Sequence, residues 1–98
     1  MGQLSERMER MGKSITELMM QPIPHPVFAE VIEEVCRAQD LHGPQHSAHE
    51  SYAVIKEELD EFWAEVMKKK EVRDPNVMRK ELIQIAAMAC RAVIDLRL

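Results

Sequence analysis

The sequence predicts an all-α protein, a helical bundle built on an antiparallel helix hairpin. Helix-breaking residues concentrate at positions 21–26, 42–44 and 74–75. Between these breaks, apolar residues recur at the three- and four-residue spacing of an amphipathic helix, and no segment shows the sustained alternation of a strand. We therefore expect four helices, at about residues 4–20, 26–41, 47–70 and 74–98.

The first predicted helix is the weakest of the four, because its apolar stripe is thin. Such a segment is typical of an arm that orders only against a partner. The stretch QPIPHP that follows predicts an extended connector, since each proline biases the preceding residue away from helix. We accordingly divide the chain into an N-terminal segment with a proline-rich connector, residues 1–25, and a helical domain, residues 26–98.

Local signals mark the ends of the other three helices. Pro26 suits a first helical position, and Gly43 suits a left-handed stop. Ser47 and Glu50 have the spacing of a capping box, in which the two side chains satisfy the first amides reciprocally. Asp74, followed directly by a proline, predicts the N-cap of the last helix.

The apolar faces of these helices predict the core. We expect it to contain Val27, Phe28, Val31, Ile32, Val35 and Leu41 from the second helix, with Tyr52, Ile55, Leu59, Phe62, Val66 and Met67 from the third. Trp63 is expected in the core rather than as a base-stacking platform. The fourth helix is apolar almost all round over residues 82–90, so we expect burial on most sides. A monomer of 98 residues can hardly bury a helix so completely, which predicts a homo-oligomer, either a dimer or a tetramer.

Composition excludes several classes of function. The net charge of −4 argues against a non-specific nucleic-acid binder, which needs a basic surface. No apolar run is long enough for a signal peptide or a membrane span, so we expect no membrane partner. Cys36 and Cys90 lie far apart, which is typical of buried small hydrophobic residues in a reducing compartment. These features together predict a cytoplasmic protein.

Acidic residues gather on the two helices of the predicted hairpin. Glu58 and Glu61 stand at i and i+3 on one face of the third helix. A polar stripe runs down the otherwise apolar fourth helix and contains Glu81, Gln84, Arg91 and Asp95. If the hairpin turns near residues 72 and 73, the pairs 58/61 and 81/84 differ in level by about 4–5 Å, which side chains can bridge.

Carboxylates that face each other in a buried seam repel strongly unless they are protonated or bound to a cation. Hard oxygen ligands suit Mg²⁺, which characteristically binds protein carboxylates and substrate phosphates together. The sequence therefore predicts a magnesium site that could take a phosphate ligand. The competing interpretation is a solvated acidic face, which is what an acidic cluster on a helix usually is.

The same residues resemble a known family. Glu58 and Glu61, followed by Glu81 and Gln84, are similar to the ExxE…ExxD signature of MazG-like all-α nucleoside triphosphate pyrophosphohydrolases, and the flanking sequences EELDEFWAEV and ELIQIAAMACRAVIDL agree. The resemblance covers about residues 46–98, and the second helix fits the helix that precedes the motifs. It implies an oligomeric, Mg²⁺-dependent hydrolase that cleaves the α–β bond of a (deoxy)nucleoside triphosphate, giving monophosphate and pyrophosphate. It also implies that Glu58, Glu61 and Glu81 are catalytic metal ligands.

One position departs from the signature, because Gln84 stands where the family has its last aspartate. An amide oxygen can still bind a metal, but the site has one negative charge fewer. Three outcomes remain open at this point: weaker metal binding without substrate phosphates, compensation by another carboxylate such as Glu57, or loss of catalysis. A nucleotide-binding protein without hydrolase activity and a helical interaction module are therefore the alternatives to an enzyme.

Other polar residues allow further interpretations. His42, His46 and His49 cluster before the third helix, but an HExxH zinc motif is missing, so we expect capping and solvent contacts. Contact of His46 or His49 with a phosphate is a looser possibility. Arg91 and Asp95, at i and i+4, are candidate site residues that could also only neutralise each other.

Overall fold

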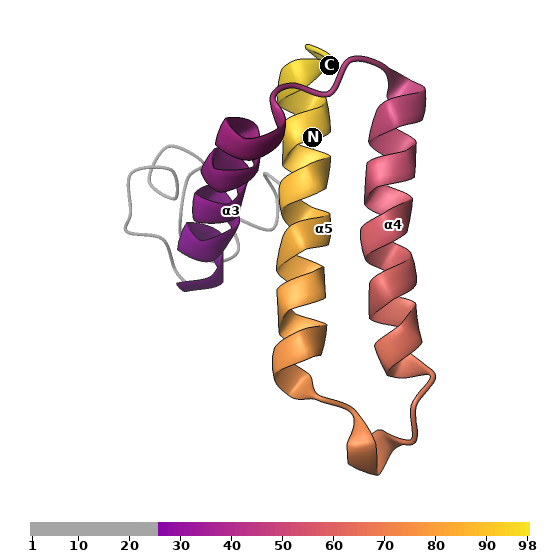
Figure 1. The fold of residues 1–98 in the computed structure, drawn as a ribbon. Coiled ribbons are helices and arrows are strands. Elements are labelled where there is room, and N and C mark those ends of the chain that lie inside the picture. Colours follow the sequence, from indigo (N-terminus) through magenta and orange to yellow (C-terminus); the bar gives the residue numbers. More distant parts are fainter. Residues whose placement is uncertain (1–25) are drawn as a thin grey trace, which may run out of the picture.

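The computed structural model describes residues 26–98, so the predicted first helix lies outside the described residues. The described elements are α3 (Pro26–His42), α4 (Ala48–Val66), the short 3₁₀ helix η1 (Lys70–Val72) and α5 (Pro75–Asp95). No strand occurs among residues 26–98, which confirms the all-α prediction for this part of the chain. In Figure 1, α4 and α5 run antiparallel with η1 in the connection between them, and α3 lies on the other side of α5.

The capping signals act largely as predicted. Ser47 Oγ accepts a hydrogen bond of 3.1 Å from the amide of Glu50, whereas the Glu50 carboxylate accepts from the amide of His46 rather than that of Ser47. One of the two hydrogen bonds of the capping box is therefore formed as predicted. The second comes from the amide one residue earlier than predicted. Asp74 caps α5 by accepting from the amide of Asn76 at 2.9 Å. Gly43 has φ 67°, the left-handed conformation that favours glycine, directly after the end of α3.

Two helices end earlier than predicted. Helix α4 ends at Val66, not near residue 70, and Arg73 Nε donates to the Val66 carbonyl at 3.0 Å and to that of Lys68 at 3.2 Å. Helix α5 ends at Asp95 rather than at residue 98. The amide of Leu98 reaches the carbonyl of Val93 at 3.1 Å, while Arg97 adopts a φ of 55°, so a Schellman-type stop closes this helix without glycine.

The centre of the core is built from small side chains. Ala38 of α3 and Ala87 of α5 are 1% and 0% exposed, and Met88 lies beside them. Four half-buried residues pack against this centre: Val31, Val35, Val54 and Ile55. Alanines at the contact allow α3 and α5 to approach closely, and the flexible thioether of Met88 fills the remaining space toward α4.

Several residues that we expected in the core are exposed instead. The prediction was wrong for Phe28, Ile32, Leu41, Tyr52, Leu59, Met67 and Trp63, all of which are at least 50% exposed. Cys36 and Cys90 are also exposed, not buried. Helix α5 is not covered on most sides, since Leu82 and Val93 are about half exposed. The physical reason is that three described helices leave one side of the hairpin uncovered.

The exposed apolar residues of the hairpin follow one spacing on both helices. Tyr52, Leu59 and Trp63 of α4 stand at i, i+7 and i+11, and Leu82, Ala89 and Val93 of α5 repeat this spacing. At about 100° per residue, each stripe lies roughly 100–120° around its helix from Glu58 or Glu81. In an antiparallel pair, these rotations place both stripes on the hairpin face opposite Gln84. We call these six residues the hairpin apolar face.

A candidate metal centre and its adjoining cavity

Three glutamates converge where α4 packs against α5. Glu58 and Glu61 come from α4 and Glu81 comes from α5, and one carboxylate oxygen of each lies within 4.8 Å of the others. Glu81 is buried, Glu58 is half-buried and Glu61 is exposed. The cluster therefore lies at an edge of the helix pair, with one side buried and the other open to solvent. The antiparallel register that we inferred from the turn brings these residues together.

Gln84 belongs to the same cluster. With its carboxamide nitrogen toward the carboxylates, Nε2 donates to Glu58 Oε2 at 2.7 Å and to Glu81 Oε2 at 3.2 Å. The opposite orientation places Oε1 against carboxylate oxygens, which is unfavourable unless a cation lies between them. A 180° turn of one amide thus lets Gln84 serve the cluster either as a donor without a metal or as an oxygen ligand with one.

The surroundings of Glu58 favour its protonated form. Burial, a hydrogen bond with Glu81 and the negative charge of Glu61 together raise the pKa of Glu58 from 4.5 to about 8. The metal-free cluster consequently holds a proton at neutral pH, which relieves part of the repulsion among three carboxylates. A divalent cation bound between them would relieve the same repulsion and displace that proton.

The donor set fits a hard divalent cation. Oxygens around an octahedral Mg²⁺ at 2.0–2.1 Å are about 2.9 Å apart when adjacent and about 4.2 Å apart when opposite. The three carboxylate oxygens lie within 4.8 Å of one another. Small side-chain movements would bring them to the separations of an octahedral site. Carboxylate and amide oxygens are also the ligand types that Mg²⁺ and Ca²⁺ prefer over softer donors. Glu58, Glu61 and Glu81 could therefore hold such an ion.

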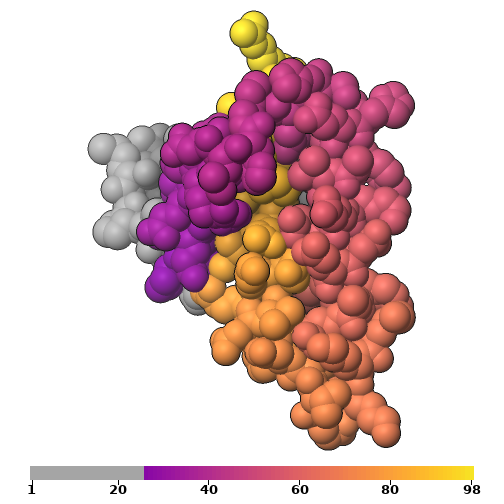
Figure 2. Space-filling view, viewed as in Figure 1, coloured from indigo at the N-terminus to yellow at the C-terminus, as the bar shows by residue number. Residues whose placement is uncertain are grey.

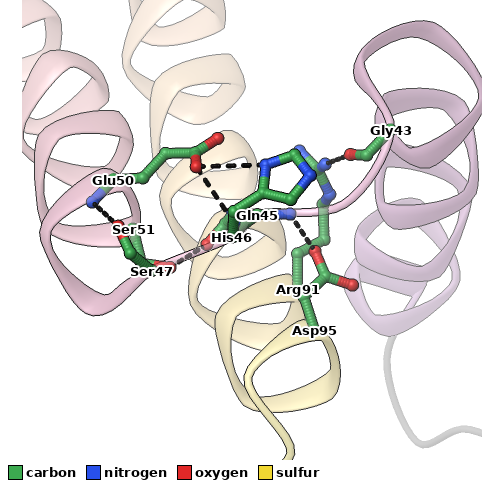
Figure 3. Close-up of polar contacts among 8 residues, drawn as sticks. All are labelled: Gly43, Gln45, His46, Ser47, Glu50, Ser51, Arg91 and Asp95. Atoms are coloured by element: carbon green, nitrogen blue, oxygen red, sulfur yellow. Dashed lines mark hydrogen bonds and ion pairs between the residues drawn. The ribbon is translucent and has the colours of Figure 1, made fainter.

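The additional candidates lie in different places. Glu57 is exposed and lines a cavity beside the cluster, whereas His49 is exposed and outside the group of convergent carboxylates. Arg91 and Asp95 do not pair with each other within residues 26–98. Instead, Arg91 Nη2 donates to the carbonyl of Gly43, and Asp95 accepts from the amide of Gln45 at 2.8 Å (Figure 3).

The three histidines form no metal-binding group with other His, Cys, Asp or Glu side chains of residues 26–98. His46 Nδ1 lies 3.4 Å from the Glu50 carboxylate, and both residues are substantially exposed (Figure 3). This is the capping and solvent role that we expected for the segment before α4.

A cavity of about 330 Å³ adjoins the carboxylates. Its lining includes Glu58 and Gln84 together with Gly43, Gln45 and Arg91. Figure 2 shows the surface hollowed between α3 and α4, with α5 at its floor.

Sequence reasoning missed Gln45, which is 3% exposed and holds the α3–α4 connection in place. Its side chain accepts from Ser51 Oγ and donates to the Met88 carbonyl at 3.4 Å. A single glutamine in a loop gives no periodic signal that could have revealed this role.

Comparisons with known protein families, with curated proteins and with solved structures found no match for this chain. No helix among residues 26–98 is long and apolar enough to cross a membrane.

The raised pKa of Glu58 predicts how the stability of the metal-free protein depends on pH. The folded state holds this proton up to about pH 8, whereas the unfolded chain releases it near 4.5. The protonated carboxyl therefore contributes stability that is fully present below 4.5 and is lost as the pH rises through about 8. Thermal melts in EDTA should show Tm falling across this window.

Glu58→Gln should flatten that slope, because the amide is neutral at every pH and has nearly the same shape. Glu57→Gln, a change at the adjacent exposed glutamate, is the matched control and should preserve it. Equal slopes for the wild type and Glu58→Gln would mean that the cluster does not hold the proton.

Proposed function

We propose that this protein is a Mg²⁺-dependent pyrophosphohydrolase that cleaves a nucleoside triphosphate into monophosphate and pyrophosphate. The observation that carries the proposal is the convergence of Glu58, Glu61 and Glu81 from two helices, with one oxygen of each within 4.8 Å. A solvated acidic face does not require carboxylates from separate helices to meet beside a buried glutamate. Such an arrangement gains from a bound cation in both stability and charge balance.

The phosphate part of the proposal rests on charge and on resemblance. The chain has a net charge of −4, so a polyphosphate needs a cation between itself and these carboxylates. Mg²⁺ characteristically binds one or two protein carboxylates together with substrate phosphates. The resemblance of the motifs at 58–61 and 81–84 to MazG-like pyrophosphohydrolases agrees with this chemistry and suggests the α–β bond as the one cleaved.

In this mechanism Glu58, Glu61 and Glu81 would hold the ion, with Gln84 as a further oxygen ligand. A bound Mg²⁺ would supply charge neutralisation and polarisation of the phosphoryl group. One glutamate carboxylate orients a water molecule and accepts its proton as the water oxygen bonds to phosphorus. The bond between that phosphorus and the oxygen that bridges the α- and β-phosphates breaks. The bridging oxygen leaves with pyrophosphate when the α-phosphorus is attacked, or with the nucleoside monophosphate when the β-phosphorus is attacked.

Gln84 supports a second candidate, a protein that binds the nucleotide without hydrolysing it. The amide can donate to both Glu58 and Glu81, so these two carboxylates have a hydrogen-bond donor even without metal. A site with one charge fewer should bind Mg²⁺ more weakly before the nucleotide phosphates arrive. A helical interaction module is the remaining alternative, and it predicts no joint stabilisation by Mg²⁺ and nucleotide.

We further propose that the protein is a homo-oligomer, a dimer or a tetramer, formed through the hairpin apolar face. Its two stripes have the same i, i+7, i+11 spacing, and Tyr52 and Trp63 are 67% and 57% exposed. Exposed apolar side chains that gather on one face typically mark an interface. Two hairpins packed face to face would bury these stripes in a four-helix arrangement and leave the carboxylates of each on the outer side.

Removal of one ligand should abolish the activity. Glu81→Gln should lower Mg²⁺-dependent pyrophosphate release by roughly 100-fold or more while helicity is retained, because the amide keeps the volume but weakens the metal site. Glu58→Gln should do the same, and Glu71→Gln, at an exposed residue of η1, should not. Pyrophosphate release by the wild type that persists in EDTA would contradict a metal mechanism.

A charged ligand at position 84 should strengthen the ion site. Gln84→Asp should tighten Mg²⁺ binding to the nucleotide-free protein by about 1–3 kcal/mol, since the gain is offset by desolvation and by repulsion from Glu58 and Glu81. Without metal, the variant should melt below the wild type at neutral pH and recover in acid. Calorimetric melts with and without Mg²⁺ test this, and a loss that Mg²⁺ does not rescue would exclude the site.

A charge on the hairpin apolar face should weaken self-association. Sedimentation of the wild type at micromolar concentration should give a dimer or larger species, and Leu59→Glu should shift it toward monomer, because a buried carboxylate is costly. Asp60→Glu, at an exposed site outside the face, serves as the control. A monomeric wild type with its helices intact would contradict the proposed interface.

A further inference from the structure

Helix α3 presents apolar side chains on the side that faces away from the glutamate cluster. Phe28 and Ile32, at i and i+4, are 51% and 55% exposed. Ala38 marks the line of contact with α5, because it is buried in the core. At about 100° per residue, Phe28 and Ile32 lie roughly 80° and 120° around α3 from Ala38. Arg37, which lines the cavity beside the cluster, lies about 100° from Ala38 in the opposite direction.

Helix α5 continues this apolar surface. The two helices run in the same direction (Figure 1), and Ala87 is the α5 residue buried in the core beside α3. Gln84 lies about 60° around α5 from Ala87, on the side of the cavity. The exposed Cys90 and the half-buried Ala86 lie about 60° and 100° around in the opposite direction. We call the residues on this side the α3–α5 apolar surface: Phe28, Ile32, Ala86 and Cys90.

Residues 4–20, which lie outside the described part of the chain, have the composition of a helix that could cover this surface. Their apolar residues recur at helical spacing on one face, namely Leu4, Met8, Met11, Ile15 and Leu18. A helix over residues 4–20 would match the length of α3, which has 17 residues and spans about 25 Å. Unbranched methionine side chains adapt to a surface that combines large and small residues.

The connector between this segment and α3 is short. Residues 21–25 reach at most about 16–18 Å when extended, which exceeds the 8–10 Å between the axes of packed helices. Connections of about 2–8 residues commonly join neighbouring helices in bundles. A segment held on so short a connector has an effective concentration of about millimolar, which favours it over a second copy at micromolar concentration.

We propose that residues 4–20 form a helix that packs antiparallel to α3 and covers the α3–α5 apolar surface of its own chain. With residues 21–25 crossing between the helices, residue 20 lies level with residue 26. The register then pairs residues whose numbers add up to about 46 or 47: Leu18 with Phe28, Ile15 with Ile32, and Met11 with Cys36. The packing involves neither metal nor substrate, so it is independent of the proposed function.

The first test uses the native Cys36 as a reporter in the full-length protein with Cys90→Ser. Met11→Cys should form a disulfide with Cys36 of the same chain under mild oxidation, because the two residues are level. Glu9→Cys is the matched control, since it is close in level but about 160° around the helix from Met11, and it should react roughly tenfold more slowly.

Non-reducing gel electrophoresis and mass spectrometry of the tryptic peptides distinguish a disulfide within one chain from a covalent dimer. A faster reaction of Met11→Cys within one chain would support the proposal. Covalent dimers alone, absence of a disulfide, or equal rates for the two variants would overturn it.

The second test needs no cysteine. If Ile15 contacts Ile32, the fall in Tm of the double variant Ile15→Ala/Ile32→Ala should be smaller than the sum of the two single falls, because both substitutions remove the same contact. Ile15→Ala with Leu59→Ala, which combines the segment with the hairpin apolar face, is the control and should be additive. Additivity for the first pair, or coupling between Ile15 and Leu59, would contradict the proposed position of the segment.

Discussion

The structure depends on the antiparallel packing of α4 against α5. This contact buries Glu81 and brings it to Glu58 and Glu61, so the stability of the hairpin and the chemistry of the site are coupled. Packing that brings three carboxylates together costs free energy unless protons, donors or a cation compensate. The described residues provide the first two, through a pKa of about 8 at Glu58 and through the amide of Gln84.

Helix α3 and the loop after it complete the site from the other side of α5. The contact of Ala38 with the core positions α3, and an ion pair between Glu30 and Arg79 joins the same two helices. Gln45 then fixes the loop through Asp95 and Met88. The cavity beside the cluster is therefore lined by residues from α3, the loop after it, α4 and α5.

Local and periodic features of the sequence were sufficient to predict most of the fold. Ser47 and Asp74 identify helix starts because capping is a contact between near neighbours, and Gly43 identifies a stop for the same reason. The glutamate cluster could be inferred because rise per residue links the levels of two helices joined by a short turn.

Burial was the property that sequence predicted worst. An apolar stripe shows that a face needs covering, but not what covers it, so Trp63 and Leu59 were placed in a core that the described helices do not build around them. The connection at Gln45 and the bond from Arg91 to the Gly43 carbonyl were equally hidden, since long-range hydrogen bonds leave no pattern in the sequence.

The chemistry of position 84 shows what a glutamine contributes to the cluster when no metal is bound. A fourth carboxylate would strengthen metal binding, but it would add repulsion to a seam that is already protonated at Glu58. A carboxamide avoids that charge and, by rotation of one torsion, presents either a donor or an acceptor to the same neighbours. The metal-free fold thereby retains a hydrogen-bonded cluster. In the function that we propose, affinity for the cation would then depend more strongly on the phosphates that accompany it.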